Sequence, residues 1–179
     1  MEIRTDPLTV SSLCADDIAR RTAELAELLV ACVHDGASIG FVLPFGSGEA
    51  EAFWTKKVLP GVRDGTRVVL AAEANGRIVG SVQLNHDTPA NQRHRADVNK
   101  LLVHPNFRRR GIARSLMAEI ERIAGQLGRS LLTLDTRTGD SAEPLYVSIG
   151  YAVSGVIPGY CLDVGKTRLD STTVMYKAL

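Results

Sequence analysis

The chain has no long apolar run, and this absence narrows what it can be. Among its 179 residues, no uninterrupted apolar stretch approaches the ~20 residues that a membrane-spanning helix needs. The first ten residues, MEIRTDPLTV, contain no apolar core of the kind found in signal peptides. We therefore expect a cytoplasmic protein with no membrane partner.

Cysteine is also scarce. Cys14, Cys32 and Cys161 are widely spaced and odd in number, and no CxxC pair occurs. No cysteine–histidine spacing is typical of a zinc site. Thiols normally stay reduced in a cytoplasmic protein, so the sequence predicts free cysteines and no metal.

The chain carries almost no excess charge of one sign. Lys and Arg number 21 against 20 Asp and Glu, which leaves a net charge of +1. Proteins that bind nucleic acid usually carry a basic stripe or field. This chain has only a local cluster at Arg108–Arg110. The cluster favours a small anionic ligand over nucleic acid, and a solvated, charged helix end is the alternative interpretation.

The composition is that of one globular domain. Hydrophobic residues make up 45% of the chain and charged residues 23%. There is no internal repeat, low-complexity segment or linker, and the length suits a single core. We expect one domain over residues 1–179.

The period of the apolar residues predicts alternating strands and helices. Asn75-Gly76 joins two strands as a hairpin turn. Asp140 and Glu143 are spaced as a capping box for a short helix that ends at Gly150, and Ser47 is a candidate cap for another. The order is βααβββαβαββ, which predicts a mixed α/β domain. The expected strands are 2–9, two within 66–85, 95–105, 130–137, 151–157 and 171–178, and the longer helices are 16–33, 48–59 and 110–127.

The basic cluster precedes the third of these longer helices, directly after the strand NKLLV. The first four N–H groups of a helix have no partner within it, and the helix dipole adds partial positive charge there. Gly111 has no Cβ, so an anion can approach the backbone closely. These features together predict a pyrophosphate cradle.

The segment Arg108–Ala113, RRRGIA, is similar to the R/Q-x-x-G-x-G/A motif of the GNAT acetyltransferases. The strand LLVHP, the helix SLMAEIERIA and the later LYVSIGY follow the order of that family over about residues 66–155. The resemblance implies the GNAT fold, a mixed, mostly antiparallel sheet of about seven strands flanked by about four helices. It also implies an N-acetyltransferase that uses acetyl-CoA as cosubstrate.

The resemblance assigns binding of acetyl-CoA to one continuous part of the chain. Edge backbone groups of the strand would pair with the pantetheine arm, and the Val103 N–H would point at the thioester oxygen. Many family members carry an asparagine seven residues before the helix tyrosine, where this chain has Gly139. The implied cofactor-binding residues are Leu101, Leu102, Val103, Arg108, Arg109, Arg110, Gly111, Ile112, Ala113 and Arg114.

Three residues are candidates for the chemistry. Tyr146 matches the family tyrosine near the CoA sulfur, and its phenol can protonate the departing thiolate. Asp135 and Asp97 are candidates to accept the proton of the amine, directly or through water. The structural alternatives are a core aromatic for Tyr146, a hydrogen-bonded strand-end carboxylate for Asp135 and a surface residue for Asp97.

Three further segments, VHDGASIGF, LLTLDT and PGYC, resemble the tabtoxin-resistance acetyltransferases, which acetylate a small β-lactam amino-acid toxin. This implies a small amine or amino-acid-like acceptor and a role in antibiotic resistance. An aminoglycoside, polyamine or protein amine remains open as acceptor, as does a non-catalytic CoA sensor, and either a monomer or a homodimer. His34 is alternatively a helix-end residue and Trp54 a core residue. The candidate acceptor-binding residues are His34, Asp35, Phe41, Trp54 and Tyr160.

Overall fold

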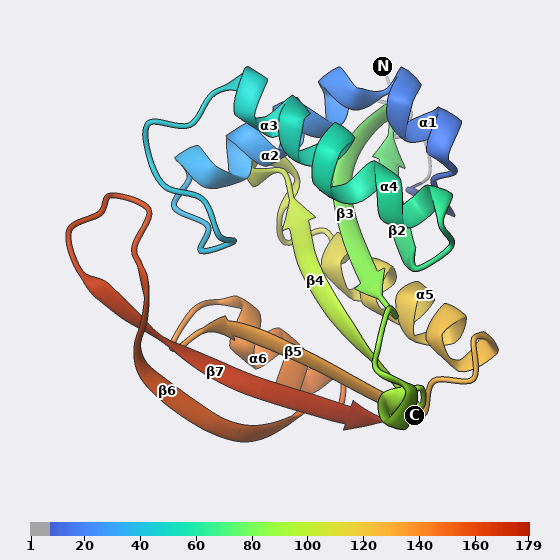
Figure 1. The fold of residues 1–179 in the computed structure, drawn as a ribbon. Coiled ribbons are helices and arrows are strands. Elements are labelled where there is room, and N and C mark those ends of the chain that lie inside the picture. The colour runs from blue at the N-terminus through green and yellow to red at the C-terminus, as the bar shows by residue number, and fades with distance from the viewer. Residues whose placement is uncertain (1–7) are drawn as a thin grey trace, which may run out of the picture.

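Seven strands form one sheet at the centre of the computed structural model, which describes residues 8–179 (Figure 1). Neighbouring strands run antiparallel, except for the parallel pair β4 and β5, which confirms the predicted mixed, mostly antiparallel sheet. The predicted strand at 2–9 lies almost wholly outside the described residues. In sheet order the strands are β1 (Thr9–Ser12), β2 (Arg67–Ala74), β3 (Arg77–Asn85), β4 (Arg95–Val103), β5 (Leu131–Arg137), β7 (Leu169–Ala178) and β6 (Ala152–Leu162).

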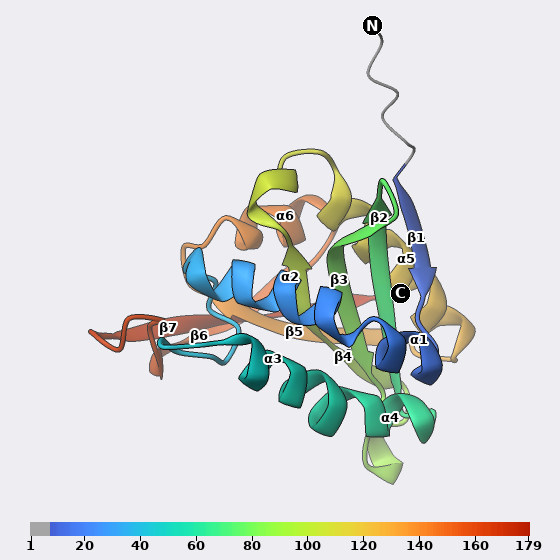
Figure 2. The same cartoon turned by 90° about the horizontal axis from the view of Figure 1, so that it is seen from above.

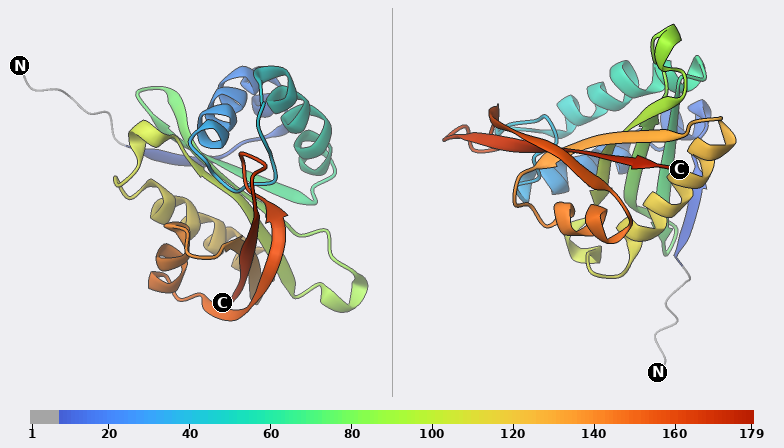
Figure 3. Two further views of the ribbon diagram at one scale, coloured as in Figure 1. Left: turned by 90° about the vertical axis from the view of Figure 1, so that its left-hand side faces the viewer. Right: turned by 90° about the horizontal axis from the view of Figure 1, so that it is seen from below.

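Helices cover both faces of the sheet (Figures 2 and 3). Four helices and a π-helical turn pack on one face, and α5 and α6 pack on the other, each over its own apolar cluster. No helix among the described residues has the length and apolar character that crossing a membrane requires. The helices are α1 (Ala15–Arg20), α2 (Thr22–His34), α3 (Ser47–Phe53), the π-helical turn η1 (Trp54–Val58), α4 (Leu59–Arg63), α5 (Ile112–Gln126) and α6 (Ala142–Ser148).

The helices before β2 differ from the prediction. The single helix expected over 16–33 is broken at Arg21, whose φ of −107° and ψ of 19° are not helical, so α1 and α2 are separate. The helix expected over 48–59 continues through the π-helical turn into α4. Ser47 is the first helical residue rather than the cap, because Gly46 occupies the cap position and no side chain caps it.

The elements next to the predicted cradle follow the sequence pattern closely. Asn75 and Gly76 both have positive φ, 52° and 72°, as a type I′ hairpin turn requires. Helix α5 packs an apolar side against the sheet, where Ile112, Leu116 and Ile120 are at most 3% exposed. A Cβ at Gly80 would lie 2.9 Å from Ile112 Cγ2, so glycine there allows α5 to sit close to the sheet.

Strands β4 and β5 separate soon after they meet. They pair only where residues 95–97 of β4 face residues 131–133 of β5. Beyond that point β4 carries a bulge against β3, with Lys100 in the left-handed region at a φ of 52°. A bulge bends a strand and increases its twist. The two strands therefore diverge toward their C-terminal ends (Figure 1).

The C-terminal hairpin is longer than predicted. Pro158–Leu162, expected in a loop, continue strand β6 across an irregularity between Ile157 and Cys161. The turn after β6 reaches the loop between α2 and α3, where the Leu43 N–H donates to the Val164 carbonyl at 2.9 Å. Figure 1 shows the two loops side by side. They close one end of the space between the diverging strands.

Candidate active site

A cavity of about 740 Å³ lies where β4 and β5 diverge. Its walls come from the bulged part of β4, the start of α5, the end of β5, helix α6, the loop after α2, and Tyr160 and Cys161 of β6. These segments are far apart in the sequence. The separation of the two strands is what brings them to one space.

The start of α5 forms one end of the cavity. Gly111 caps the helix with a φ of +79°, and Arg109 before it has a φ of +63°. The first helical bond is donated by the Ser115 N–H, to the Gly111 carbonyl at 3.0 Å. The N–H groups of residues 112–114 therefore have no partner within the helix, and they can bind an anion.

The predicted cofactor residues gather here with one exception. Leu101, Leu102, Val103, Arg108, Arg109, Gly111, Ile112, Ala113 and Arg114 all line the cavity. Arg110 does not. Its guanidinium lies over the Phe107 ring, 5.0 Å from the centroid, and donates to the Asn106 carbonyl at 3.2 Å.

Arg108 of the basic cluster and Arg114 of α5 tie the cavity walls together. Arg108 Nη1 lies 2.5 Å from Asp35 Oδ2, and Arg108 Nε donates to the Val103 carbonyl at 3.4 Å. Arg114 donates to Ser148 Oγ at 2.9 Å, which links α5 to α6. A diphosphate at the helix start would thus meet three cavity-lining guanidinium groups, of which only that of Arg108 has a carboxylate partner among residues 8–179.

The free edge of β4 forms the floor. The His104 N–H donates to the Val79 carbonyl of β3 at 2.9 Å. Successive N–H groups of a strand point to opposite sides, so the Val103 N–H faces away from β3 and into the gap. The Val103 N–H is therefore available to an acyl oxygen.

Tyr146 lies on the cavity wall from α6 and is only 6% exposed. Burial raises the pKa of its phenol well above the ordinary value, and the carboxylates of Asp135 and Asp140 raise it further. Its ring packs against Tyr151, with centroids 5.7 Å apart. The phenol therefore stays protonated at neutral pH and can donate a proton.

The two candidate carboxylates have different surroundings. Asp135 lines the cavity, is exposed to it, and accepts one hydrogen bond, from Thr172 Oγ1 at 3.1 Å. The cavity explains why a carboxylate can interrupt the apolar run of β5. Asp97 does not line the cavity: Arg95 Nη1 lies 2.6 Å from its Oδ1, and Thr133 Oγ1 also donates to it. Asp97 thus joins β4 to β5 where the strands still pair.

Some of the candidate acceptor residues line the cavity and others do not. Asp35 and Tyr160 line the cavity, and His34, Phe41 and Trp54 do not. Trp54 is fully buried and its Nε1 donates to the Leu25 carbonyl at 3.0 Å, so its assignment to the acceptor site is corrected to the core. Phe41 packs between the rings of Phe45 and Phe53.

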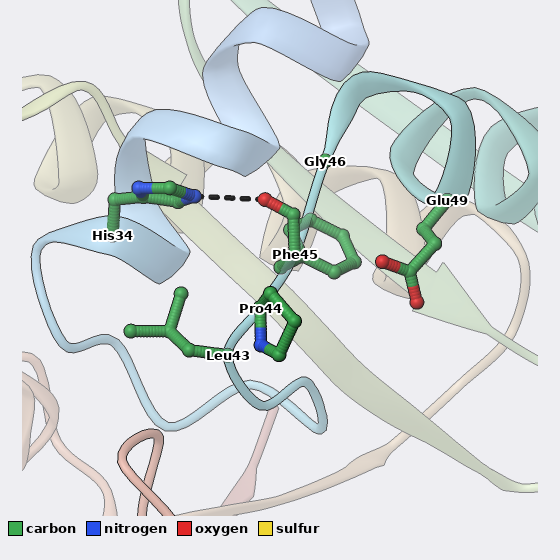
Figure 4. Close-up of a pocket in the computed structure, with 6 residues that line it drawn as sticks. All are labelled: His34, Leu43, Pro44, Phe45, Gly46 and Glu49. Carbon is green, nitrogen blue, oxygen red and sulfur yellow. Dashed lines mark hydrogen bonds between the residues drawn. The ribbon is translucent and has the colours of Figure 1, made fainter.

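His34 ends α2 and belongs to a different hollow. Its Nε2–H donates to the Phe45 carbonyl at 2.8 Å (Figure 4). This hollow is lined by His34, Glu49 and residues 43–46 and lies apart from the β4–β5 cavity. The expected contact of His34 with the acceptor is therefore corrected to the structural alternative, a residue that binds a loop carbonyl at a helix end.

Sequence reasoning missed Lys100 and Arg137, which also line the cavity. Arg137 holds the wall closed, because its Nη1 donates to the Gly36 carbonyl at 3.2 Å and its Nη2 lies 3.1 Å from Asp140 Oδ2. Lys100 is half-buried on the β4 bulge, with Nζ 5.8 Å from the Phe41 centroid. A lysine next to the apolar pair Leu101-Leu102 was the one sequence signal for it.

No three His, Cys, Asp or Glu side chains gather as a possible metal site anywhere in residues 8–179. All three cysteines are free, and Cys32 is buried, which raises the pKa of its thiol to about 11. The chemistry that the cavity offers is therefore that of backbone N–H groups, guanidinium groups, a protonated phenol and an exposed carboxylate.

Comparisons with known proteins point to one family of enzymes. The sequence pattern of the acetyltransferase (GNAT) family matches residues 43–151. An acetyltransferase of Pectobacterium atrosepticum is 33% identical over 102 residues, which are 56% of this chain and 65% of that protein. The match thus spans slightly less than two thirds of the relative's length.

Solved structures with low sequence identity share the fold. The yncA protein of Salmonella typhimurium, solved with its cofactor acetyl-CoA, is 20% identical with a TM-score of 0.76, and the alignment covers 97% of this chain and 95% of that one. A ribosomal-protein-alanine N-acetyltransferase of Brucella melitensis is 22% identical with a TM-score of 0.76, over 96% and 99% of the two chains. At such identities the likeness concerns the fold alone.

Proposed function

The chain belongs to the acetyltransferase (GNAT) family, and on that premise we propose that it transfers an acetyl group from acetyl-CoA to the amine of a small acceptor. The observation that carries the proposal is the β4–β5 cavity. It has unpaired helix N–H groups and arginines at one end and Tyr146 and Asp135 farther along its walls. We propose that residues 1–179 act as one catalytic domain.

The cavity residues fit acetyl-CoA. Arg108, Arg109 and Arg114 and the N–H groups of residues 112–114 would hold the pyrophosphate, because they supply positive charge and donors at one point. The free edge of β4 at 101–103 would pair with the pantetheine amides as an added strand does. Bound acetyl-CoA supplies the activated acetyl group.

Three groups of this chain would act on the reacting atoms. The Val103 N–H donates to the acyl oxygen, where negative charge develops during attack. Asp135 attracts the ammonium form of the acceptor and takes its proton, directly or through water, so that the amine can attack. Tyr146 donates its phenolic proton to the departing sulfur, since its raised pKa keeps that proton in place.

The acceptor side of the cavity supports a small, polar molecule. Asp35 and Tyr160 reach it from the loop after α2 and from β6, and Asp135 reaches it from β5. The resemblance to the tabtoxin-resistance acetyltransferases suggests an amino-acid-like acceptor, such as a toxin or antibiotic. The Brucella melitensis neighbour is named for a protein acceptor, so the fold does not decide the acceptor.

The proposal is tested by incubating purified protein and acetyl-CoA with a panel of amino acids, amine antibiotics, polyamines and peptides. Free CoA thiol is measured against time, and mass spectrometry identifies the acetylated product. We expect small amines to be acetylated. Tight binding of CoA without release of thiol from any acceptor would instead assign the chain a non-catalytic, CoA-binding role.

A further inference from the structure

Lys100 is a cation that the fold places against aromatic rings. Its Nζ lies 5.8 Å from the centroid of Phe41 and 5.9 Å from that of Phe53. A Cβ at Gly40 would be 3.6 Å from the same atom, so the loop backbone closes a third side. On its remaining side the lysine lines the β4–β5 cavity.

Among the described residues, no carboxylate forms an ion pair with this charge. Within residues 8–179, Lys100 Nζ has no carboxylate within 4 Å and makes no hydrogen bond, whereas Lys177, also half-buried, lies 2.6 Å from Glu121 Oε2. Burial lowers the pKa of Lys100, and Arg67 lowers it further, against the opposing effect of Asp135. An unpaired charge in such a place is unfavourable.

The backbone of Lys100 is unfavourable as well. Its φ of 52° lies in the left-handed region, where glycine or asparagine fits better than lysine. The two aromatic rings attract the ammonium in part, but the local conformation does not favour a lysine at this bulge. Lys100 thus combines an ammonium group that has no carboxylate partner among the described residues with a left-handed backbone. Two such unfavourable features at one cavity-lining residue are typical of a functional position.

Lys100 and Asp135 present opposite charges to the same cavity without pairing. Both line it, and their charged atoms are more than 4 Å apart. Asp135 Oδ2 accepts from Thr172, while Oδ1 has no hydrogen-bond partner among the described residues. One free carboxylate oxygen and one free ammonium group thus remain for a ligand that carries both charges.

We propose that Lys100 binds the carboxylate of the acceptor while Asp135 faces its amine, so that the acceptor is a zwitterionic, amino-acid-like molecule. The inference rests on the proposed acetyltransferase function and narrows its substrate class. Ammonium–carboxylate hydrogen bonds are among the stronger ones in proteins and give both affinity and orientation. They would hold the amine at a fixed place relative to the thioester.

The pyrophosphate of acetyl-CoA is a poor alternative ligand for Lys100. The lysine packs against Phe41 and Phe53, which belong to the sheet face covered by α2 and α3. The cradle is formed by the start of α5, which covers the opposite face. The two anion-binding features therefore lie on opposite sides of β4 and serve different parts of the reactants.

The test compares matched acceptors that differ only in the carboxylate. Initial rates are measured for an amino acid and its methyl ester, both with a free amine, on wild-type protein and Lys100→Met. We expect Lys100→Met to raise the KM of the amino acid by about 10- to 100-fold and to leave the KM of the ester within about 3-fold. Lys100→Arg should recover part of the affinity for the amino acid. Lys57→Met, which removes an exposed lysine on η1, is the control and should match the wild type.

Two results would overturn the inference. Equal losses on the amino acid and the ester would show that Lys100 acts on the reaction or on the fold instead of on the carboxylate. An unchanged KM for the amino acid would show that Lys100 does not bind the acceptor.

Failure of the proposed function has a different signature. In that case no acceptor of either kind releases CoA thiol, even though Lys57→Met and the wild type are folded. Binding of the same amino acids, measured by calorimetry with CoA present, then tests Lys100 on its own. Weaker binding by Lys100→Met supports the carboxylate contact, and equal binding overturns it.

Discussion

Arg108 and Asp35 form an ion pair 2.5 Å long between Nη1 and Oδ2, and both residues line the β4–β5 cavity. Asp35 directly follows helix α2, and Arg108 belongs to the basic cluster before α5. Each side chain is 43% exposed, so the pair contributes at most about 1 kcal/mol. An incoming pyrophosphate therefore competes with Asp35 for Arg108 at small energetic cost.

Replacing Asp35 with Asn should lower the KM of acetyl-CoA by about 3-fold, because the Arg108 guanidinium is then free for phosphate. The effect should fade in high salt, which screens exposed charges. Initial rates at varied concentrations of acetyl-CoA, at low and high ionic strength, measure the change in KM and its dependence on salt. Asp16→Asn removes an exposed carboxylate on α1 and serves as control. A raised KM in Asp35→Asn would mean that the carboxylate holds Arg108 in its binding position.

Gly111→Val should raise the KM of acetyl-CoA by about 10-fold or more. Nothing lies within 4 Å of a Cβ at this position, so the cause is not a clash inside the protein. A β-branched residue is strained at a φ of +79°, and its side chain would occupy the approach to the N–H groups of the cradle. The measurement is a steady-state titration with acetyl-CoA on protein shown to be folded by circular dichroism.

Gly111→Asn is the matched control, because asparagine tolerates the left-handed region. It should keep the stability of the wild type more nearly than Gly111→Val does. A folded Gly111→Val protein with an unchanged KM would remove the start of α5 from the cofactor site.

Local sequence determines the parts of the fold that could be predicted. The hairpin turn depends on two adjacent residues, Asn75 and Gly76, and the amphipathic stripe of α5 depends on one helix. The position of the proposed cradle at a helix start was also predictable, because one continuous segment builds it. Its single misplaced member, Arg110, lies over Phe107, and side-chain direction at a turn does not follow from spacing.

Tertiary contacts determine what the sequence could not predict. Pro158 and Gly159 are typical of a loop, yet β6 continues through them because β7 is longer than expected and pairs with the strand's far end. Trp54 and His34 lie near the acceptor loop in sequence, but each is held by a carbonyl elsewhere, of Leu25 and Phe45. Lys100 faces the cavity only because β4 has a bulge against β3, and no sequence pattern predicts that bulge.

Tyr146→Phe should lower kcat by on the order of 10²-fold and leave the KM of acetyl-CoA nearly unchanged, since the hydroxyl acts as the thiolate leaves. The raised pKa of Tyr146 adds a pH prediction: the wild-type kcat should not fall as the pH passes ~10, where an ordinary phenol ionises. Rapid-quench measurement of the first turnover isolates the chemical step. Tyr151→Phe alters the neighbouring buried ring and should retain the wild-type kcat. If Tyr146→Phe also retained the wild-type kcat, Tyr146 would have only a packing role.

Lys100→Met should make the protein more stable at neutral pH. Burial lowers the pKa of Lys100 in the folded state below its unfolded value of 10.5, so the unfolded state binds more protons between these two values. The free energy of unfolding of the wild type therefore rises with pH between the two pKa values. Below the lower of the two, the wild type is at its greatest disadvantage relative to Lys100→Met. Urea unfolding should show that Lys100→Met exceeds the wild type in free energy of unfolding by more at pH 7 than near pH 10. A variant less stable than the wild type at pH 7 would contradict the assignment of an unfavourable buried charge.

Asp135 and Asp97 should separate into one residue that serves the reaction and one that joins the strands. Asp135→Asn keeps the shape of the side chain but removes the proton acceptor, so kcat/KM should fall most at low pH. It should recover partly as the pH approaches the pKa of the amine, ~8 for an α-amino group, because solvent then supplies the neutral form. The measurement is a pH–rate profile for one accepted substrate.

Asp97→Asn should instead lower stability, by about 1 kcal/mol, because it breaks the ion pair with Arg95 at the last paired residues of β4 and β5. Its kcat/KM should have the same pH dependence as the wild type, with a smaller loss than Asp135→Asn. Thr133→Val removes the hydroxyl that donates to Asp97 and should reproduce this pattern, since it weakens the same junction without touching a charge in the cavity. The contrary result is a pH–rate profile in which Asp97→Asn loses kcat/KM at low pH as Asp135→Asn does, while Thr133→Val does not. That result would place the Asp97 carboxylate in the proton path, connected to Asp135 through water.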